Sequence, residues 1–94
     1  MASYVPWYGK KREQLAKHEH ELMLFLQKGT EMSKVLKAAE IVRAAEVRAL
    51  KARIAQLPAS EKSAGTIVDL EHEIQVWMQL PVAAIIEKYR MRKA

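Results

Sequence analysis

The sequence contains no cysteine and has few of the residues that make turns and sheets. Without cysteine, the chain cannot form a disulfide framework, offers no thiol nucleophile and cannot bind zinc or an iron–sulfur cluster through thiolates. Only three of its 94 residues are glycine, three are proline and 6% are aromatic. A β-sandwich or barrel needs more turn residues and β-formers than this. Because 50% of the residues are hydrophobic, many of them alanine, the composition predicts one small all-α domain.

Long hydrophobic runs are also absent. The longest stretch without a charge covers residues 74–86, which is too short to cross about 30 Å of hydrocarbon and is interrupted by Pro81. The first seven residues have no basic region followed by an apolar core, so we expect no secretory signal. Together with the lack of cysteine, these features predict a cytoplasmic protein that does not work on a membrane.

The positions of glycine and proline predict how the chain divides. Gly9, the pair Gly29 and Thr30, and the segment 58–60 interrupt the helical pattern, and Pro81 should kink or break it. We expect an irregular aromatic arm over residues 1–9 and a single helical domain over 10–94, with helices at about 10–28, 31–57, 61–79 and 82–92. Thr30 and Ser60 are the expected N-caps of the second and third helices.

The second predicted helix is apolar on two faces. One face is a row of small side chains at three-four spacing, which we call the small-residue row: Val35, Ala38, Val42, Ala45, Ala49 and Ala52. A second apolar row lies about 100–150° around the helix: Val47, Leu50, Ile54 and Leu57. Two other short helices can hardly cover both faces, so the pattern predicts a helical hairpin plus a proline-kinked third helix, completed by oligomerisation through the small-residue row.

The simplest such homo-oligomer is a two-fold dimer. The alternative is a monomeric three-helix bundle in which alanine only supplies helix propensity. Trp77, Ile85 and Tyr89 are the predicted anchors for a protein partner, since apolar side chains at this spacing suit a partner helix as well as a core. The favoured function is a small non-enzymatic interaction or assembly module.

Three glutamates, Glu19, Glu46 and Glu71, fall on or beside apolar faces. Because buried carboxylates need partners, we expect Arg43 or Arg53 to bridge to Glu19 or Glu71 and fix the packing register. Carboxylates set up for acid–base chemistry are the alternative. No nucleophile or glycine-rich loop accompanies these residues, so we expect no catalytic site.

Histidine offers little for a metal site. The nearest match to the Glu-x-x-His pattern of bundle di-metal sites is Asp69 with His72, and both lie opposite the apolar side of their helix. His18 and His20 point to different sides of theirs. No P-loop, dinucleotide-binding fingerprint or hydrolase elbow is present either, so we expect no metal and no cofactor.

The chain carries a formal net charge of +5, and this leaves open a second function. Its two strongest basic clusters are Lys10, Lys11 and Arg12, and Arg90, Arg92 and Lys93. Phosphate contacts need flexible positive charge, so the alternative is a basic nucleic-acid-binding protein that uses these clusters. Residues 58–87 are acidic, and this favours complementarity within the protein or between subunits at least as much.

Overall fold

The computed structural model describes residues 6–58, 60 and 64–92, and the part of the chain that it describes is all-helical, as the composition predicts. The helices are α1 (Pro6–Lys28), α2 (Met32–Ala55), α3 (Ala64–Gln79) and α4 (Val82–Arg90). These ranges contain no β-strand. Each helix differs from its predicted bounds by a few residues at most.

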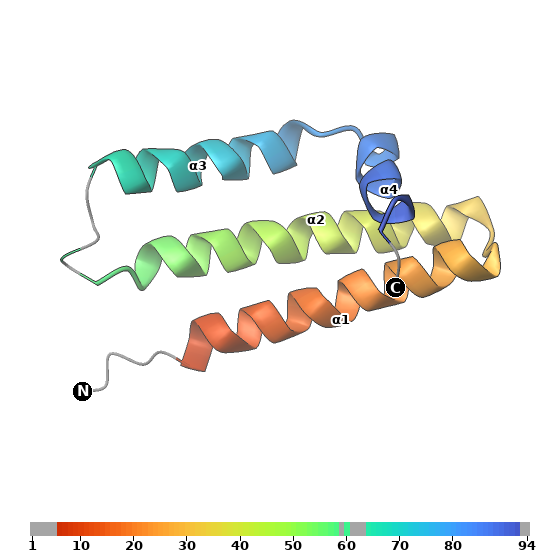
Figure 1. Cartoon of the computed structure of the whole chain (residues 1–94), viewed down its shortest axis with the longest axis horizontal. Helices are drawn as coiled ribbons and strands as arrows, with labels where there is room; N and C mark the ends of the chain where they lie inside the picture. Colours follow the sequence, from red (N-terminus) through yellow and green to blue (C-terminus); the bar gives the residue numbers. More distant parts are fainter. Residues whose placement is uncertain (1–5, 59, 61–63, 93–94) are drawn as a thin grey trace.

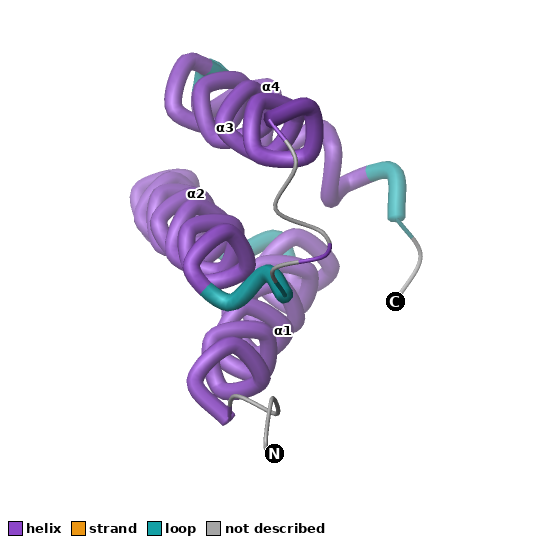
Figure 2. Tube along the Cα trace, turned by 90° about the vertical axis from the view of Figure 1, so that its left-hand side faces the viewer, coloured by secondary structure: helices purple, strands orange, loops and turns teal. Residues whose placement is uncertain are grey.

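The helix α2 is the centre of the fold. It lies between α1 and α3, and the short α4 crosses one end of the molecule (Figure 1). α2 contacts all three other helices, and α4 also contacts α1. Seen along the long axis, α4 lies on one side of α2, and no further helix of the described chain covers its opposite side (Figure 2). α2 is therefore buried on one side and open to solvent on the other.

The ends of α1 and α2 follow from a few residues. Pro6 is the first residue of α1, where its missing N–H costs no helical hydrogen bond. The helix continues through Gly9, so the prediction of an irregular arm is wrong for residues 6–9, and residues 1–5 lie outside the described part. Gly29 ends α1 with a φ of 67°, a conformation that costs glycine nothing. The Thr30 N–H then donates to the Phe25 carbonyl at 3.0 Å, which completes a Schellman C-cap.

Neither predicted N-cap is found. Glu31 precedes α2, and its side chain makes no capping hydrogen bond. Ser60 lies in a short 3-10 turn four residues before α3 begins at Ala64. Thr30 is instead used to close α1. Because α2 begins at Met32, the residue at its N-cap position is Glu31, one residue after Thr30.

The break before α4 lies at Pro81. α3 ends at Gln79, and Pro81 has extended backbone angles (φ −61°, ψ 147°) as the residue that precedes α4. Its carbonyl accepts the N–H groups of Ala84 and Ile85 at 3.0 and 3.2 Å. Pro81 therefore starts the new helix, and its lack of an N–H prevents it from continuing the old one.

The small-residue row lies inside the protomer. Its six side chains are between 0% and 4% exposed in the single chain: Val35, Ala38, Val42, Ala45, Ala49 and Ala52. Small side chains let neighbouring backbones approach closely, and the neighbours here are helices of the same chain. The prediction that this row meets a second copy is corrected by this burial. α4, which follows Pro81 and contacts α2, adds a third helix to the two that the sequence pattern provided to cover α2.

The three predicted partner anchors are also part of the core. Trp77 is 7% exposed, Ile85 0% and Tyr89 1%. Their spacing on α3 and α4 satisfies contacts within the chain, so they are not available to a partner in this structure. Tyr89, Ile85, Leu22 and Val42 are the largest fully buried side chains, and they join α1, α2 and α4 into one core.

Candidate functional site

A polar cluster holds α4 against α1. The Tyr89 hydroxyl donates a hydrogen bond to the Glu19 carboxylate. Nη1 of Arg92 lies 3.5 Å from the same carboxylate, and its guanidinium lies 4.6 Å from the centre of the Tyr89 ring. Burial, together with the hydrogen bond to Glu19, raises the pKa of the Tyr89 hydroxyl well above its usual value. Tyr89 therefore stays protonated and serves as a fixed donor.

Glu46 of α2 belongs to the same electrostatic environment. Its pKa is raised, first by burial and then by the negative charges of Glu19 and Glu73, while Arg12 and Arg92 lower it. The cluster has no nucleophile beside a base. Within residues 6–58, 60 and 64–92, no group of three or more His, Asp or Glu side chains is placed to hold a metal ion. The contacts of Tyr89, Glu19 and Arg92 position α4, and we assign no chemistry to them.

Neither Arg43 nor Arg53 forms an ion pair with Glu19 or Glu71 in the described part of the chain, so that prediction is wrong. Nη1 of Arg43 donates to the Met78 carbonyl at 2.9 Å, its Nη2 donates to the Leu80 carbonyl, and its Nε lies 3.3 Å from Glu40. The break at Pro81 leaves carbonyl groups at the end of α3 without helical partners, and the guanidinium of Arg43 pairs with them. Arg43 thus joins α2 to the end of α3.

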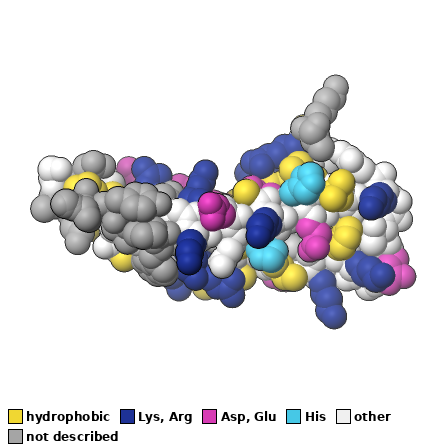
Figure 3. Space-filling model, turned by 90° about the horizontal axis from the view of Figure 1, so that it is seen from below, with side chains coloured by type: hydrophobic (Ala, Val, Ile, Leu, Met, Phe, Trp, Pro, Cys, Tyr) yellow, Lys and Arg dark blue, Asp and Glu magenta, His cyan; other side chains and the backbone are white. Residues whose placement is uncertain are grey.

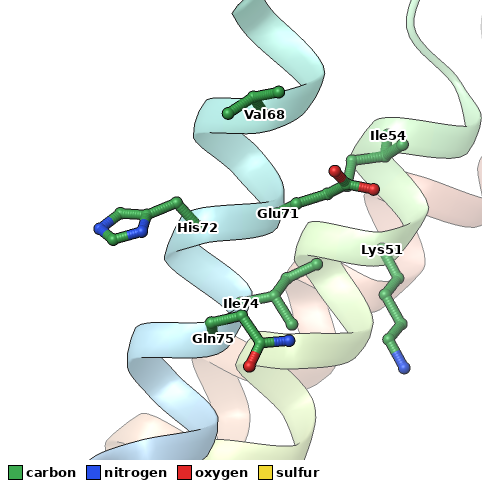
Figure 4. Close-up of a pocket in the computed structure, with 7 residues that line it drawn as sticks. All are labelled: Lys51, Ile54, Val68, Glu71, His72, Ile74 and Gln75. Atoms are coloured by element: carbon green, nitrogen blue, oxygen red, sulfur yellow. The ribbon is translucent and has the colours of Figure 1, made fainter.

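An open furrow with a volume of about 590 Å³ lies between α2 and α3. Its lining, which defines the α2–α3 furrow, is Lys51 and Ile54 from α2 and Val68, Glu71, His72, Ile74 and Gln75 from α3. Ile54 and Ile74 form its apolar floor, the Glu71 carboxylate extends toward Ile54, and His72 points away (Figure 4). Val68 on its rim is 58% exposed.

The two sides of the furrow carry opposite charge. α3 contains Asp69, Glu71 and Glu73 and no lysine or arginine, whereas α2 has six basic and two acidic residues. The ion pairs found among the described side chains join Arg43 to Glu40, Arg90 to Glu87 and Arg92 to Glu19. None of these joins α2 to α3. At the furrow itself the charged lining residues are Lys51 of α2 and Glu71 of α3, and neither forms an ion pair with another described residue.

Of the two predicted nucleic-acid clusters, the C-terminal one is partly neutralised by ion pairs. Lys10, Lys11 and Arg12 belong to the first turns of α1. Arg90 lies 3.5 Å from Glu87, Arg92 pairs with Glu19, and Lys93 is outside the described residues. The face of the molecule seen from the α1 side shows lysine and arginine interspersed with acidic residues and histidine (Figure 3). In the part of this face that is not covered by grey atoms, the basic side chains do not form a single patch.

A cationic surface that was not among the predicted binding sites lies on the solvent side of α2. It follows the same three-four spacing as the small-residue row, shifted by one residue, and we call it the cationic row: Lys34, Lys37, Ile41, Ala44, Arg48 and Lys51. All of these residues are exposed except Ala44, which is half-buried. The spacing of this row can be read from the sequence, but the row was not predicted as a binding surface.

Comparison with known proteins adds no further information. No protein-family model, curated protein or solved structure matches this chain. Among the described helices, none is long and apolar enough to cross a membrane. The site assignments therefore depend on the geometry of this chain alone.

Proposed function

We propose that this chain is a non-enzymatic assembly module that pairs with a second copy of itself through the α2–α3 furrow. One observation carries the proposal: an open furrow with an apolar floor is lined by Glu71 on α3 and by Lys51 on α2, and neither side chain forms an ion pair with another described residue. A second copy supplies both kinds of charge at once. Self-association thus remains the favoured function, through a different surface from the small-residue row.

The exposed apolar residues of α3 support a helix contact along the furrow. Val68, Glu71, Gln75 and Met78 follow three-four-three spacing and so share one side of α3. The two apolar members of this set, Val68 and Met78, are 58% and 53% exposed. Burying these side chains against a second copy removes apolar surface from water and stabilises the pair.

The charges select one two-fold arrangement. If the two-fold axis runs along the furrow, α3 of each copy lies over α2 of the other, so acidic residues meet basic ones. An axis across the furrow would put α3 on α3 and acid on acid. Because Lys51 and Glu71 line the same hollow, the first arrangement brings Glu71 of each copy close to Lys51 of the other. The dimer then contains two symmetry-related ion pairs.

Charge reversal tests this arrangement. We expect Lys51→Glu and Glu71→Lys each to weaken dimerisation about tenfold, because each variant places like charges together twice. An equimolar mixture of the two variants should form a heterodimer, since each copy then supplies the charge that the other needs. Light scattering over a hundredfold concentration range gives the masses, and Lys17→Glu on α1 is the control for a charge reversal outside the furrow.

Two results would overturn the proposal. One is a wild-type mass that stays that of a monomer throughout this concentration range at low salt. The other is a mixture of the two variants that associates no better than either variant alone, because that result excludes pairing between Lys51 and Glu71 of different copies.

A further inference from the structure

We infer that the cationic row of α2 is a binding surface for the phosphate backbone of double-stranded nucleic acid. This inference goes beyond the proposed assembly function and concerns a different side of α2. At 100° per residue, Lys37 and Arg48 lie about 120–140° around the helix from Arg43, which faces α3. The cationic row is therefore turned away from the acidic helix that would repel a nucleic acid.

In the single chain, the four cations of the row are free to contact phosphate; in the proposed dimer, Lys51 lies close to Glu71 of the second copy, and Lys34, Lys37 and Arg48 remain free. Lys34, Lys37, Arg48 and Lys51 are all exposed, and none of them makes an ion pair with another described residue. No acidic residue occupies a position in the row. Because a rigid helix holds the cations at fixed spacing along about 25 Å, binding costs little backbone conformational entropy.

The spacing of the cations fits the two rims of a groove. Lys34 and Lys37 form one pair, Arg48 and Lys51 form a second, and the centres of the pairs are about 21 Å apart along the helix axis. Ile41 and Ala44 lie between them. A B-DNA major groove is about 12 Å wide, and its phosphate rims lie beyond that width on each side. Long side chains from the two pairs can reach both rims while the uncharged centre lies over the groove.

This arrangement predicts backbone contacts without base recognition. No hydrogen-bonding side chain occupies the centre of the row, where base edges would lie, so sequence preference should be weak. A membrane surface suits the row less well, because interfacial helices need a broad apolar face and Ile41 is the one large apolar residue in the row. Binding of a duplex to the cationic row involves one residue of the α2–α3 furrow, Lys51, which lies at the boundary between the two surfaces.

The probe is an end-labelled 24-base-pair DNA duplex of mixed sequence, followed by fluorescence anisotropy at several salt concentrations. Four phosphate contacts give a slope of log K against log salt of about −3.6, equivalent to about 100-fold weaker binding at 200 mM than at 50 mM salt. The single strand of the same length should bind more weakly, because it cannot present two rims at fixed separation.

Two matched triple variants locate the surface. Lys34→Gln, Lys37→Gln and Arg48→Gln together remove three cations of the row and leave the furrow unchanged. Lys10→Gln, Lys11→Gln and Arg12→Gln remove two lysines and one arginine from α1, so both proteins carry the same net charge. We expect the first variant to bind at least tenfold more weakly at 50 mM salt, with its slope reduced to about −0.9. The second should keep most of the wild-type affinity.

Each other outcome overturns the inference. Absence of wild-type binding to the duplex at 50 mM salt would exclude the surface altogether. Equal weakening by both triple variants would show that binding follows net charge alone, and greater weakening by the α1 variant would place the surface at the N-terminal cluster. Equal affinity for the single strand would exclude the fit to two groove rims. Circular dichroism of both variants confirms that the helices are intact.

Discussion

Two neighbouring rows on α2 have the same spacing and opposite surroundings. The small-residue row starts at Val35 and the cationic row starts at Lys34, and each then repeats at three and four residues, about 100° apart around the helix. The first is covered by other helices of the same chain, and the second faces solvent. Spacing therefore identifies which residues share a face, but the chemistry of the face and the rest of the chain decide what covers it.

The largest test of this difference uses adjacent alanines. We expect Ala45→Arg to unfold the protein at 25 °C, because a guanidinium at a 3% exposed site has neither space nor partners, with a loss above about 4 kcal/mol. Ala44→Arg, on the cationic row, should change the free energy of unfolding by about 0.5 kcal/mol or less. Urea unfolding followed by circular dichroism measures both.

A folded Ala45→Arg variant would contradict the position of the small-residue row inside the protomer. If this variant were folded and merely reduced a dimer to a monomer, the small-residue row would face a second copy, as the sequence alone suggested. The burial of the row in the single chain argues against that outcome.

A smaller test removes volume from each side of α2. Val42 is fully buried and Ile41 is 42% exposed, although they are consecutive residues. Val42→Ala should destabilise the fold by about 2 kcal/mol, because it leaves a cavity under α4 and α1. Ile41→Ala should cost about 0.5 kcal/mol or less, since its side chain is partly hydrated already. Equal losses at the two positions would show that the solvent side of α2 is covered in solution.

The sequence predicted the positions of the helices well. It predicted poorly what covers each helix face. Glycine, proline and periodicity act locally, so Gly29 and Pro81 mark real helix ends. The partners of Glu19 could not be predicted, because Tyr89 and Arg92 reach it only after α4 turns back across the bundle. The same turn packs α4 against α2 as well as α1, so one tertiary event decided several contacts that appeared independent in the sequence.

Arg43 and Arg48 lie on different sides of α2 and differ in their hydrogen bonds. Arg43 donates to the Met78 and Leu80 carbonyls, whereas Arg48 makes no ion pair with any residue that the structure describes. Arg43→Gln should destabilise the fold by about 1–2 kcal/mol and increase amide hydrogen exchange at the end of α3, because carbonyls at the break lose a charged donor. Arg48→Gln, the matched control, should stay within about 0.5 kcal/mol of wild type. Identical values for the two variants would exclude a role for Arg43 in holding α3.

Glu46 is half-buried, so it is less covered than the small-residue row and less exposed than the cationic row. Its expected effect on the free energy of unfolding is the smallest of these predictions and depends on pH. Folding raises the pKa of this carboxyl, mainly through burial, so the folded protein binds the proton more tightly than the unfolded chain. Stability from this group is therefore greatest at low pH and falls as the pH rises past the unfolded pKa of about 4.3 and through the folded pKa.

Replacing Glu46 by glutamine removes the buried negative charge and keeps the shape of the side chain. We expect Glu46→Gln to unfold a few degrees above wild type at pH 7, with the difference disappearing near pH 3.5, where Glu46 is protonated in both states. Glu13→Gln on the exposed side of α1 controls for the change in net charge. Thermal melts at several pH values give the comparison. A gain of the same size at every pH would mean that Glu46 destabilises the fold through its shape, because only an effect of charge is abolished by protonation.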